Sequence, residues 1–138
     1  MIEKILVSGW PMIVVFIFDN VIANPVGWYD RWWWFDIPMH IVGGMVTAWS
    51  TQRFFMNMKI KLAKFGRMEM YPFILVGATA IIGIVWEVYE FFLHLITGFI
   101  TQPSVADTVG DLVNDLIGAI VFCSIFLVVQ QKKKKYDT

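Results

Sequence analysis

Three pairs of acidic or histidine side chains interrupt the apolar runs of this sequence at helical spacing. The pairs are Asp36 with His40, Glu87 with Glu90, and Asp111 with Asp115. Residues three or four apart share one face of a helix, so the two members of each pair project to the same side. Carboxylates with an imidazole suit a divalent cation such as magnesium, manganese, calcium, zinc or iron better than monovalent copper. The sequence therefore predicts six candidate ligands for a divalent cation, whose identity the residue types leave open.

Something must neutralise these carboxylates if they lie inside a membrane, because each ionised side chain costs at least a few kcal/mol there. Arg31 and the two histidines are too few to balance them. Three answers stay open. A bound divalent cation is the one we favour. The carboxyl groups could instead hold protons within a purely structural hydrogen-bond network, or a partner or substrate could supply the positive charge.

The composition requires that membrane. The chain has 138 residues, of which 58% are hydrophobic and only 16% charged, whereas a soluble domain is about 25% charged. Eleven basic and eleven acidic residues give zero net charge, which argues against a nucleic-acid partner. A single cysteine, Cys123, excludes an internal disulfide framework. Membrane lipids are the expected surroundings.

Four segments are long enough to cross a hydrocarbon core of about 30 Å. They lie near residues 5–23, 37–56, 71–97 and 109–130. The expected fold is all-α, a four-helix transmembrane bundle, with residues 1–138 forming one integral membrane domain. Ser104 and Asp107 form an S-x-x-D pattern, so the last helix is expected to begin before its span, with Ser104 as its N-cap.

The basic residues indicate the orientation. In a four-span topology ten of the eleven fall on one side and only Arg31 on the other, and short cytoplasmic loops collect Lys and Arg. Both termini are therefore expected in the cytoplasm, in a multi-pass protein of the cell membrane. Eight of the eleven acids fall in the outer half. The zero net charge thus conceals a strongly acidic outer half.

The candidate ligands lie at matching depths. His40 is sixteen residues from Met56, Glu87 sixteen from Tyr71, and Asp115 fifteen from Gln130. At the helical rise per residue, each lies about 22 to 24 Å above the inner boundary, and Asp36, Glu90 and Asp111 lie about one turn higher. Asp19 reaches a similar depth on the first helix. The sequence therefore predicts one acidic pocket in the outer half of the bilayer.

Other polar and aromatic residues have simpler interpretations. Residues 28–35 contain four tryptophans, one tyrosine and one phenylalanine, which favours an interfacial aromatic belt over a platform for a lipid headgroup or isoprenoid. Arg31 could pair with a lipid phosphate, with Asp30 or with Asp36. His94 is expected to be a satisfied polar residue rather than a ligand. Gly44 and Gly118 are among the small residues at which helices can approach closely.

Three motifs carry a family resemblance: F-D-I-P-M-H-I-V-G-G at 35–44, W-E-V-Y-E at 86–90 and D-T-V-G-D-L-V-N-D-L-I-G-A at 107–119. Together they resemble the small YjdF-like and VanZ-like bacterial membrane proteins over the last three spans. The resemblance implies a polar site at Asp36 and His40, at Glu87 and Glu90, and at Asp107, Asp111, Asn114 and Asp115. It implies no defined reaction.

Two functions follow as hypotheses. In the first, the acidic pocket binds a divalent cation and binds or processes the phosphate of a lipid-linked headgroup, with His40 or a carboxylate activating water. In the second, the chain is a non-catalytic accessory subunit of a larger membrane complex, such as a metal-containing oxidase or monooxygenase, and other membrane subunits complete the pocket. A proton or cation pathway is less favoured, because the inner halves of the spans carry no further relay of acids.

Overall fold

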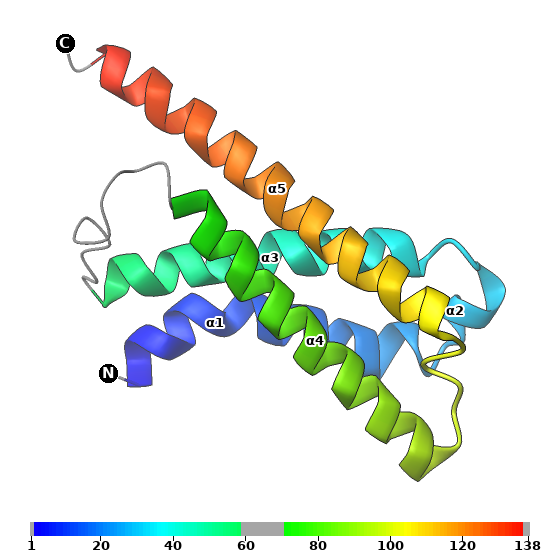
Figure 1. Cartoon of the computed structure of the whole chain (residues 1–138). Coiled ribbons are helices and arrows are strands. Elements are labelled where there is room, and N and C mark those ends of the chain that lie inside the picture. Colours follow the sequence, from blue (N-terminus) through cyan, green and yellow to red (C-terminus); the bar gives the residue numbers. More distant parts are fainter. Residues whose placement is uncertain (1, 59–70, 137–138) are drawn as a thin grey trace.

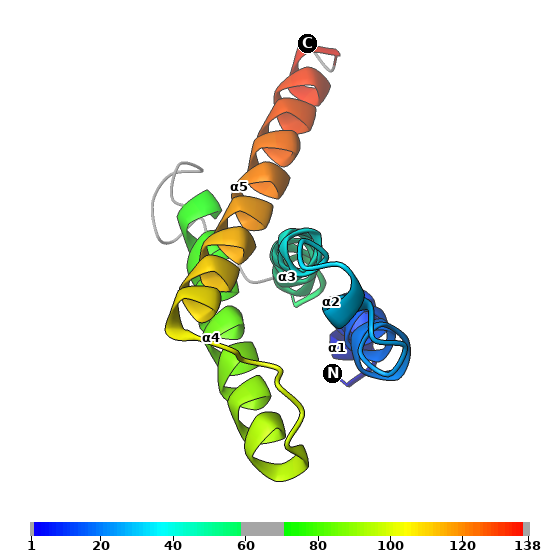
Figure 2. The ribbon, with the colours of Figure 1, turned by 90° about the vertical axis from the view of Figure 1, so that its right-hand side faces the viewer.

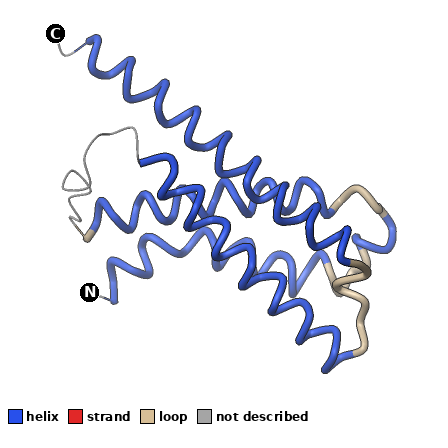
Figure 3. The backbone as a smooth tube through the Cα atoms, in the orientation of Figure 1, coloured by secondary structure: helices blue, strands red, loops and turns tan. Residues whose placement is uncertain are grey.

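The structure is a computed structural model that describes residues 2–58 and 71–136, with the side chains of Ile2 and residues 133–136 left out. All of its regular elements are helical (Figure 3). They are α1 (Ile2–Ile17), the π-helix η1 (Phe18–Ala23), α2 (Trp28–Arg31), α3 (Asp36–Asn57), α4 (Tyr71–Thr97) and α5 (Val105–Tyr136). The all-helical expectation is confirmed. The basic connection expected to face the cytoplasm, residues 59–70, lies outside the described residues.

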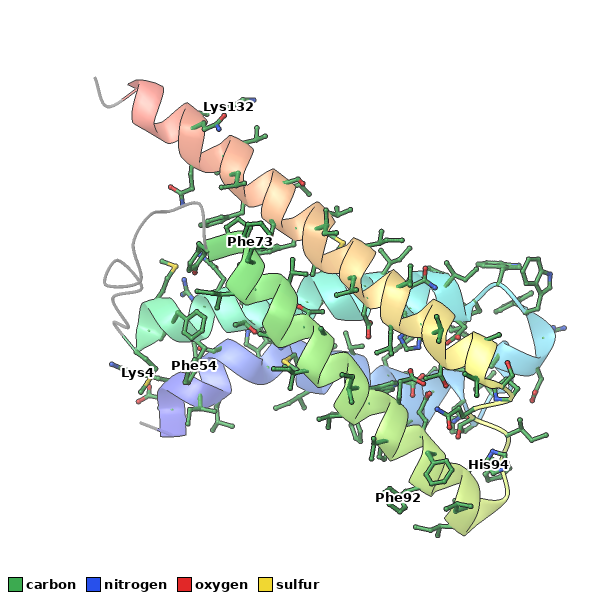
Figure 4. The ribbon with its side chains drawn as sticks, viewed as in Figure 1. Lys4, Phe54, Phe73, Phe92, His94 and Lys132 are labelled. Carbon is green, nitrogen blue, oxygen red and sulfur yellow. The ribbon has the colours of Figure 1, made fainter. Side chains whose placement is uncertain are left out.

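Three of the described helical segments are long and apolar enough to cross a membrane. They are Glu3–Ala23, Tyr71–Thr97 and Val105–Lys132. Large apolar side chains cover their surfaces, as Phe73 and Phe92 show by pointing outward from α4 (Figure 4). Such side chains are stable only in contact with lipid or another protein. The chain is therefore a membrane protein with three candidate spans.

The helix α3 is long enough for a fourth span but more polar than the other three. Its place in the bundle explains the difference, because α3 packs against α1, α4 and α5 (Figure 2). Its buried residues include His40, Thr47, Ser50 and Gln52. A helix surrounded by other helices can direct polar side chains at its neighbours rather than at lipid. Whether α3 itself crosses the bilayer remains a prediction.

The chain runs back and forth along the bundle. The N-terminus, the last turn of α3, the first turn of α4 and the C-terminus lie at one end of the molecule, and α2 and residues 98–104 lie at the other (Figure 1). The second end is called the α2 end below. A chain that crosses the membrane four times with both termini on one side needs an arrangement of this kind.

Local sequence signals explain two of the helix boundaries. The expected N-cap is confirmed, since α5 begins at Val105 and the backbone N–H of Asp107 donates to Ser104 Oγ at 3.1 Å. At the other boundary, Gly27 has φ of 74°, a left-handed conformation that favours glycine. This residue turns the chain after η1 so that α2 folds back beside it.

Candidate functional site

The centre of the site is His40, an imidazole 8% exposed on α3 and surrounded by carboxylates. Its Nε2 lies 3.5 Å from Asp36 Oδ1, one turn earlier on α3, and 3.7 Å from Asp111 Oδ1 on α5. Its Nδ1 lies 3.4 Å from Asp115 Oδ1, also on α5. Each ring nitrogen therefore faces its own acidic partners, and the structure brings together four of the six predicted ligands.

Two glycines allow α3 and α5 to approach closely enough for these contacts. A Cβ atom on Gly44 would overlap the backbone carbonyl of Asp115, and one on Gly118 would overlap the backbone carbonyl of Ile41. A third glycine, Gly83 on α4, leaves room for the Asp115 carboxylate, because a Cβ there would lie 2.5 Å from its Oδ2. The absence of side chains at these positions therefore sets the position of Asp115 beside His40.

The pair on α4 is placed differently. Glu87 is 5% exposed, and its Oε2 accepts a hydrogen bond of 3.2 Å from Gln102, which also donates to Thr108 at 2.7 Å. The other carboxylate oxygen, Oε1, has no hydrogen-bond partner among the described residues. An unpaired buried oxygen costs about 1–3 kcal/mol. Glu87 therefore has one oxygen available for a ligand. Gln102 lies in a connection that sequence patterns did not single out.

The fourth helix of the site contributes Asp19 from η1. This carboxylate is 6% exposed and accepts hydrogen bonds from the Tyr29 hydroxyl and, at 3.2 Å, from the Asn20 amide. Asn20 in turn accepts a hydrogen bond of 2.6 Å from Tyr89 on α4. Burial, together with the adjacent Asp19 carboxylate, raises the pKa of the Tyr29 phenol. Tyr29 therefore stays protonated and can continue to donate to Asp19.

The sequence favours an interfacial belt for Tyr29, whereas in the structure its hydroxyl donates to Asp19. The signal that could have found this contact is the N-P-x-G run at 24–27, which is typical of a tight turn. A turn there returns α2 toward η1. The other aromatic side chains of residues 28–35 mostly contact one another, as Trp28 and Phe35 do with ring centroids 5.3 Å apart.

Positive charge is scarce around the site. Within the described ranges, every ion pair closer than 4.0 Å involves His40. Arg31 is exposed, and its guanidinium lies 5.9 Å from the ring centroid of Trp32. The other histidine, His94, lies near the connection between α4 and α5 and outside the group around His40 (Figure 4). Neither residue balances the acids that surround His40.

Two cavities meet at the site. The first, called the apolar cavity, has a volume of about 320 Å³ and lies among α1, α3 and α4, with lining residues that include Phe16, Val46, Ile82 and Trp86. The second, called the acidic cavity, has a volume of about 540 Å³ at the α2 end. Four residues line both cavities: Asp19, Tyr29, Asp36 and Glu90. The boundary between apolar and polar space therefore coincides with the acidic residues.

The geometry around His40 Nε2 fits a metal ion. Asp36, His40 and Asp111 each offer one ligand atom, and these atoms lie within 4.8 Å of one another. Ligands bound at about 2.1 Å with tetrahedral or octahedral angles are about 3.0 to 3.4 Å apart. The distances of 3.5 and 3.7 Å from Nε2 to the two carboxylates are slightly longer. Small side-chain movements would therefore suffice to bind an ion.

The comparisons with known proteins identify a family but no characterised relative. A family model described as Predicted membrane protein (DUF2238) matches residues 10–133, which include every residue of the site. No curated protein and no solved structure matches the chain. Because the match extends over most of the sequence, the chain belongs to the DUF2238 family of predicted membrane proteins.

Proposed function

We propose that this membrane protein binds a divalent cation through Asp36, His40 Nε2 and Asp111, and that the bound cation recruits the phosphate of a lipid-linked headgroup. The observation that carries the proposal is that the two ring nitrogens of His40 face different carboxylates. Histidines that bind metal through one nitrogen usually donate the other N–H to a carboxylate or carbonyl. With Nε2 facing two candidate ligands and Nδ1 facing Asp115, His40 has this arrangement.

The donor set favours a particular class of ion. One imidazole and two carboxylates suit zinc, manganese or iron, and three protein ligands leave positions for water and for a phosphate oxygen. The free oxygen of Glu87 supports its assignment as a further ligand after a side-chain movement. Glu90 lines both cavities. If the bound phosphate ester is hydrolysed, Glu90 is our candidate base: it would take a proton from the water whose oxygen attacks phosphorus, while the bond from phosphorus to the leaving alcohol oxygen breaks.

The proposed topology places the cation site in the outer half of the cell membrane. Lys4 and Lys132 lie at the end of the bundle opposite α2 (Figure 4), which the positive-inside rule assigns to the cytoplasm. The helix α3 then supplies the fourth crossing. Two of the three motifs that carry the resemblance to YjdF-like and VanZ-like proteins, at 35–44 and 107–119, supply the residues around His40. The third, at 86–90, supplies Glu90, which shares both cavities with Asp36.

Elemental analysis of the purified protein tests the proposal. The wild-type chain in mild detergent is expected to hold about one divalent ion per chain, and His40→Ala is expected to lose it, because three ligands fall to two. His94→Ala is the matched control and should keep the ion. Folded wild-type protein without stoichiometric metal, or metal retained in His40→Ala, would refute the proposal.

The competing hypothesis, an accessory subunit of a larger complex, is decided by the same preparation. A chain that runs on native electrophoresis with other subunits, and that holds metal only in their presence, would support the subunit hypothesis. A cation held by the isolated chain supports the site proposed here.

A further inference from the structure

The two cavities differ in chemistry, and the difference indicates what kind of molecule would fill them. The apolar cavity has the size of a typical small-molecule site, for which about 300 to 1,000 Å³ is usual. It extends from the shared acidic boundary along α1, α3 and α4 to Met12 and Thr79. Its side chains offer a hydrocarbon chain almost only apolar contacts. One end of a ligand in this site should therefore be apolar.

The acidic cavity would receive the opposite end. Its lining includes five carboxylates: Asp19, Asp30, Asp36, Glu90 and Asp107. No Lys, Arg or His is found among the described residues that line it. The aromatic residues Tyr29 and Trp33 also line this cavity, and aromatic rings attract organic cations. A headgroup that is only anionic would be repelled here, whereas an ammonium group would be stabilised.

The proposed cation site borders both cavities. Asp36 lines both cavities, and His40 lines the apolar one, so a phosphate held at the cation would have apolar space on one side and acidic space on the other. The order along the ligand is then hydrocarbon chain, phosphate, ammonium.

We propose that the ligand is a zwitterionic amphiphile with one hydrocarbon chain in the apolar cavity, its phosphate at the His40 site, and an ammonium group in the acidic cavity. This inference rests on the proposed cation site and names the class of headgroup that the site recognises. Complementarity of charge and the four residues that line both cavities favour an amphiphile with this order of groups.

The experiment is native mass spectrometry of the full chain released from an uncharged maltoside detergent, because one spectrum reports both bound metal and bound amphiphile. The probes are dodecylphosphocholine, dodecyl phosphate, which lacks the ammonium, and phosphocholine, which lacks the chain. The wild type should retain dodecylphosphocholine at concentrations at least about tenfold lower than either of the others. Equal retention of dodecyl phosphate would overturn the ammonium assignment.

Neighbouring isoleucines on α4 provide a matched pair of variants. Ile82 lines the apolar cavity, whereas Ile81 is 65% exposed on the outer surface. Ile82→Trp should fill the cavity and weaken retention of dodecylphosphocholine about tenfold or more, while Ile81→Trp should leave it unchanged. Val46→Phe with Val42→Phe as its control repeats the comparison on α3, should Ile82→Trp fail to fold. Unchanged retention in a folded cavity variant that keeps its metal would overturn the chain assignment.

The acidic cavity is tested separately. The double variant Asp30→Asn with Asp107→Asn lies outside the proposed ligand set, so it should keep the metal while its preference for dodecylphosphocholine over dodecyl phosphate falls to about threefold or less. An unaltered preference would overturn the role of this cavity. Metal bound without cavity-dependent amphiphile would refute only this inference, whereas cavity-dependent amphiphile without metal would refute the cation site.

Discussion

Asp115 Oδ1 lies 3.4 Å from His40 Nδ1, while the other ring nitrogen of His40 faces Asp36 and Asp111. This contact links α3 to α5 and determines the orientation of the imidazole ring. With its proton on Nδ1, the ring can donate to Asp115 and present an unprotonated Nε2 to a ligand. Asp115, which the depth count placed among the candidate ligands, is thereby better suited to positioning His40.

Replacing Asp115 with Asn should weaken metal binding without removing it. The amide would no longer provide a negative charge beside Nδ1, and loss of such a partner typically costs 10- to 100-fold in metal affinity. Chelator competition on purified protein measures the change. Val113→Ala, at a position of α5 that is 49% exposed, is the control and should bind as the wild type does. Unchanged affinity in Asp115→Asn would contradict the positioning role.

Adding a methyl group at Gly44 or Gly118 should separate α3 from α5. Each new Cβ would overlap a backbone carbonyl of the facing helix, which cannot rotate away, so destabilisation of about 3 kcal/mol is expected, at the upper end of overpacking effects. Thermal unfolding in detergent measures this. Gly77→Ala is the control, because a Cβ there meets no atom within 4 Å. Equal melting temperatures for Gly44→Ala and Gly77→Ala would contradict the close approach of α3 and α5 at Gly44.

Removing the Tyr29 hydroxyl should destabilise the α2 end of the molecule. Asp19 would keep the Asn20 amide as its remaining side-chain donor, and loss of a hydrogen bond to a buried carboxylate costs about 1.5–3 kcal/mol. Unfolding of Tyr29→Phe measures the loss. Tyr71→Phe is the control, since no hydrogen bond of its hydroxyl is found among the described residues. A double-mutant cycle with Asp19→Asn should show coupling between the two residues.

The same tyrosine predicts a pH dependence. Its pKa is raised in the folded chain, so the folded state holds this proton more tightly than the unfolded state does. Its contribution is then complete below pH of about 10, the ordinary tyrosine value, and decreases as the pH rises further, where the unfolded chain ionises first. Melting temperatures from pH 8 to 11 should therefore fall more in wild type than in Tyr29→Phe. Parallel curves would contradict the buried hydrogen bond.

Cysteine labelling in intact cells should decide whether α3 crosses the bilayer. The native Cys123 is 5% exposed and should react little. An impermeant maleimide is expected to label Trp33→Cys and Ser104→Cys from outside, and to label Met56→Cys and Gln131→Cys only after permeabilisation. All four native residues are exposed at helix ends or in connections. Labelling of both Trp33→Cys and Met56→Cys in intact cells would show that α3 does not cross, whereas labelling of Met56→Cys and Gln131→Cys alone would reverse the orientation.

The hydropathy of the sequence was sufficient to predict candidate membrane spans in α1, α4 and α5. Apolar side chains must leave water whatever the helices pack against. The hydropathy signal was weakest for α3, whose polar residues face other helices. The S-x-x-D pattern at Ser104 correctly predicted the start of α5, since a capping hydrogen bond is local. Signals of this kind need only neighbouring residues.

Depth counting placed His40 and Asp115 at one level, and the structure has them in contact. The count could not predict which nitrogen of His40 each carboxylate faces. Nor could it predict that Glu87 accepts a hydrogen bond from Gln102, or that the Tyr29 hydroxyl donates to Asp19. The number of residues determines height along a helix, but rotation about its axis and the return of a loop depend on how neighbouring helices pack. The sequence alone thus determined the membrane class and the inventory of acidic groups. Only the packing at Gly44 and Gly118, which brings α3 against α5, decided which of those groups share a site.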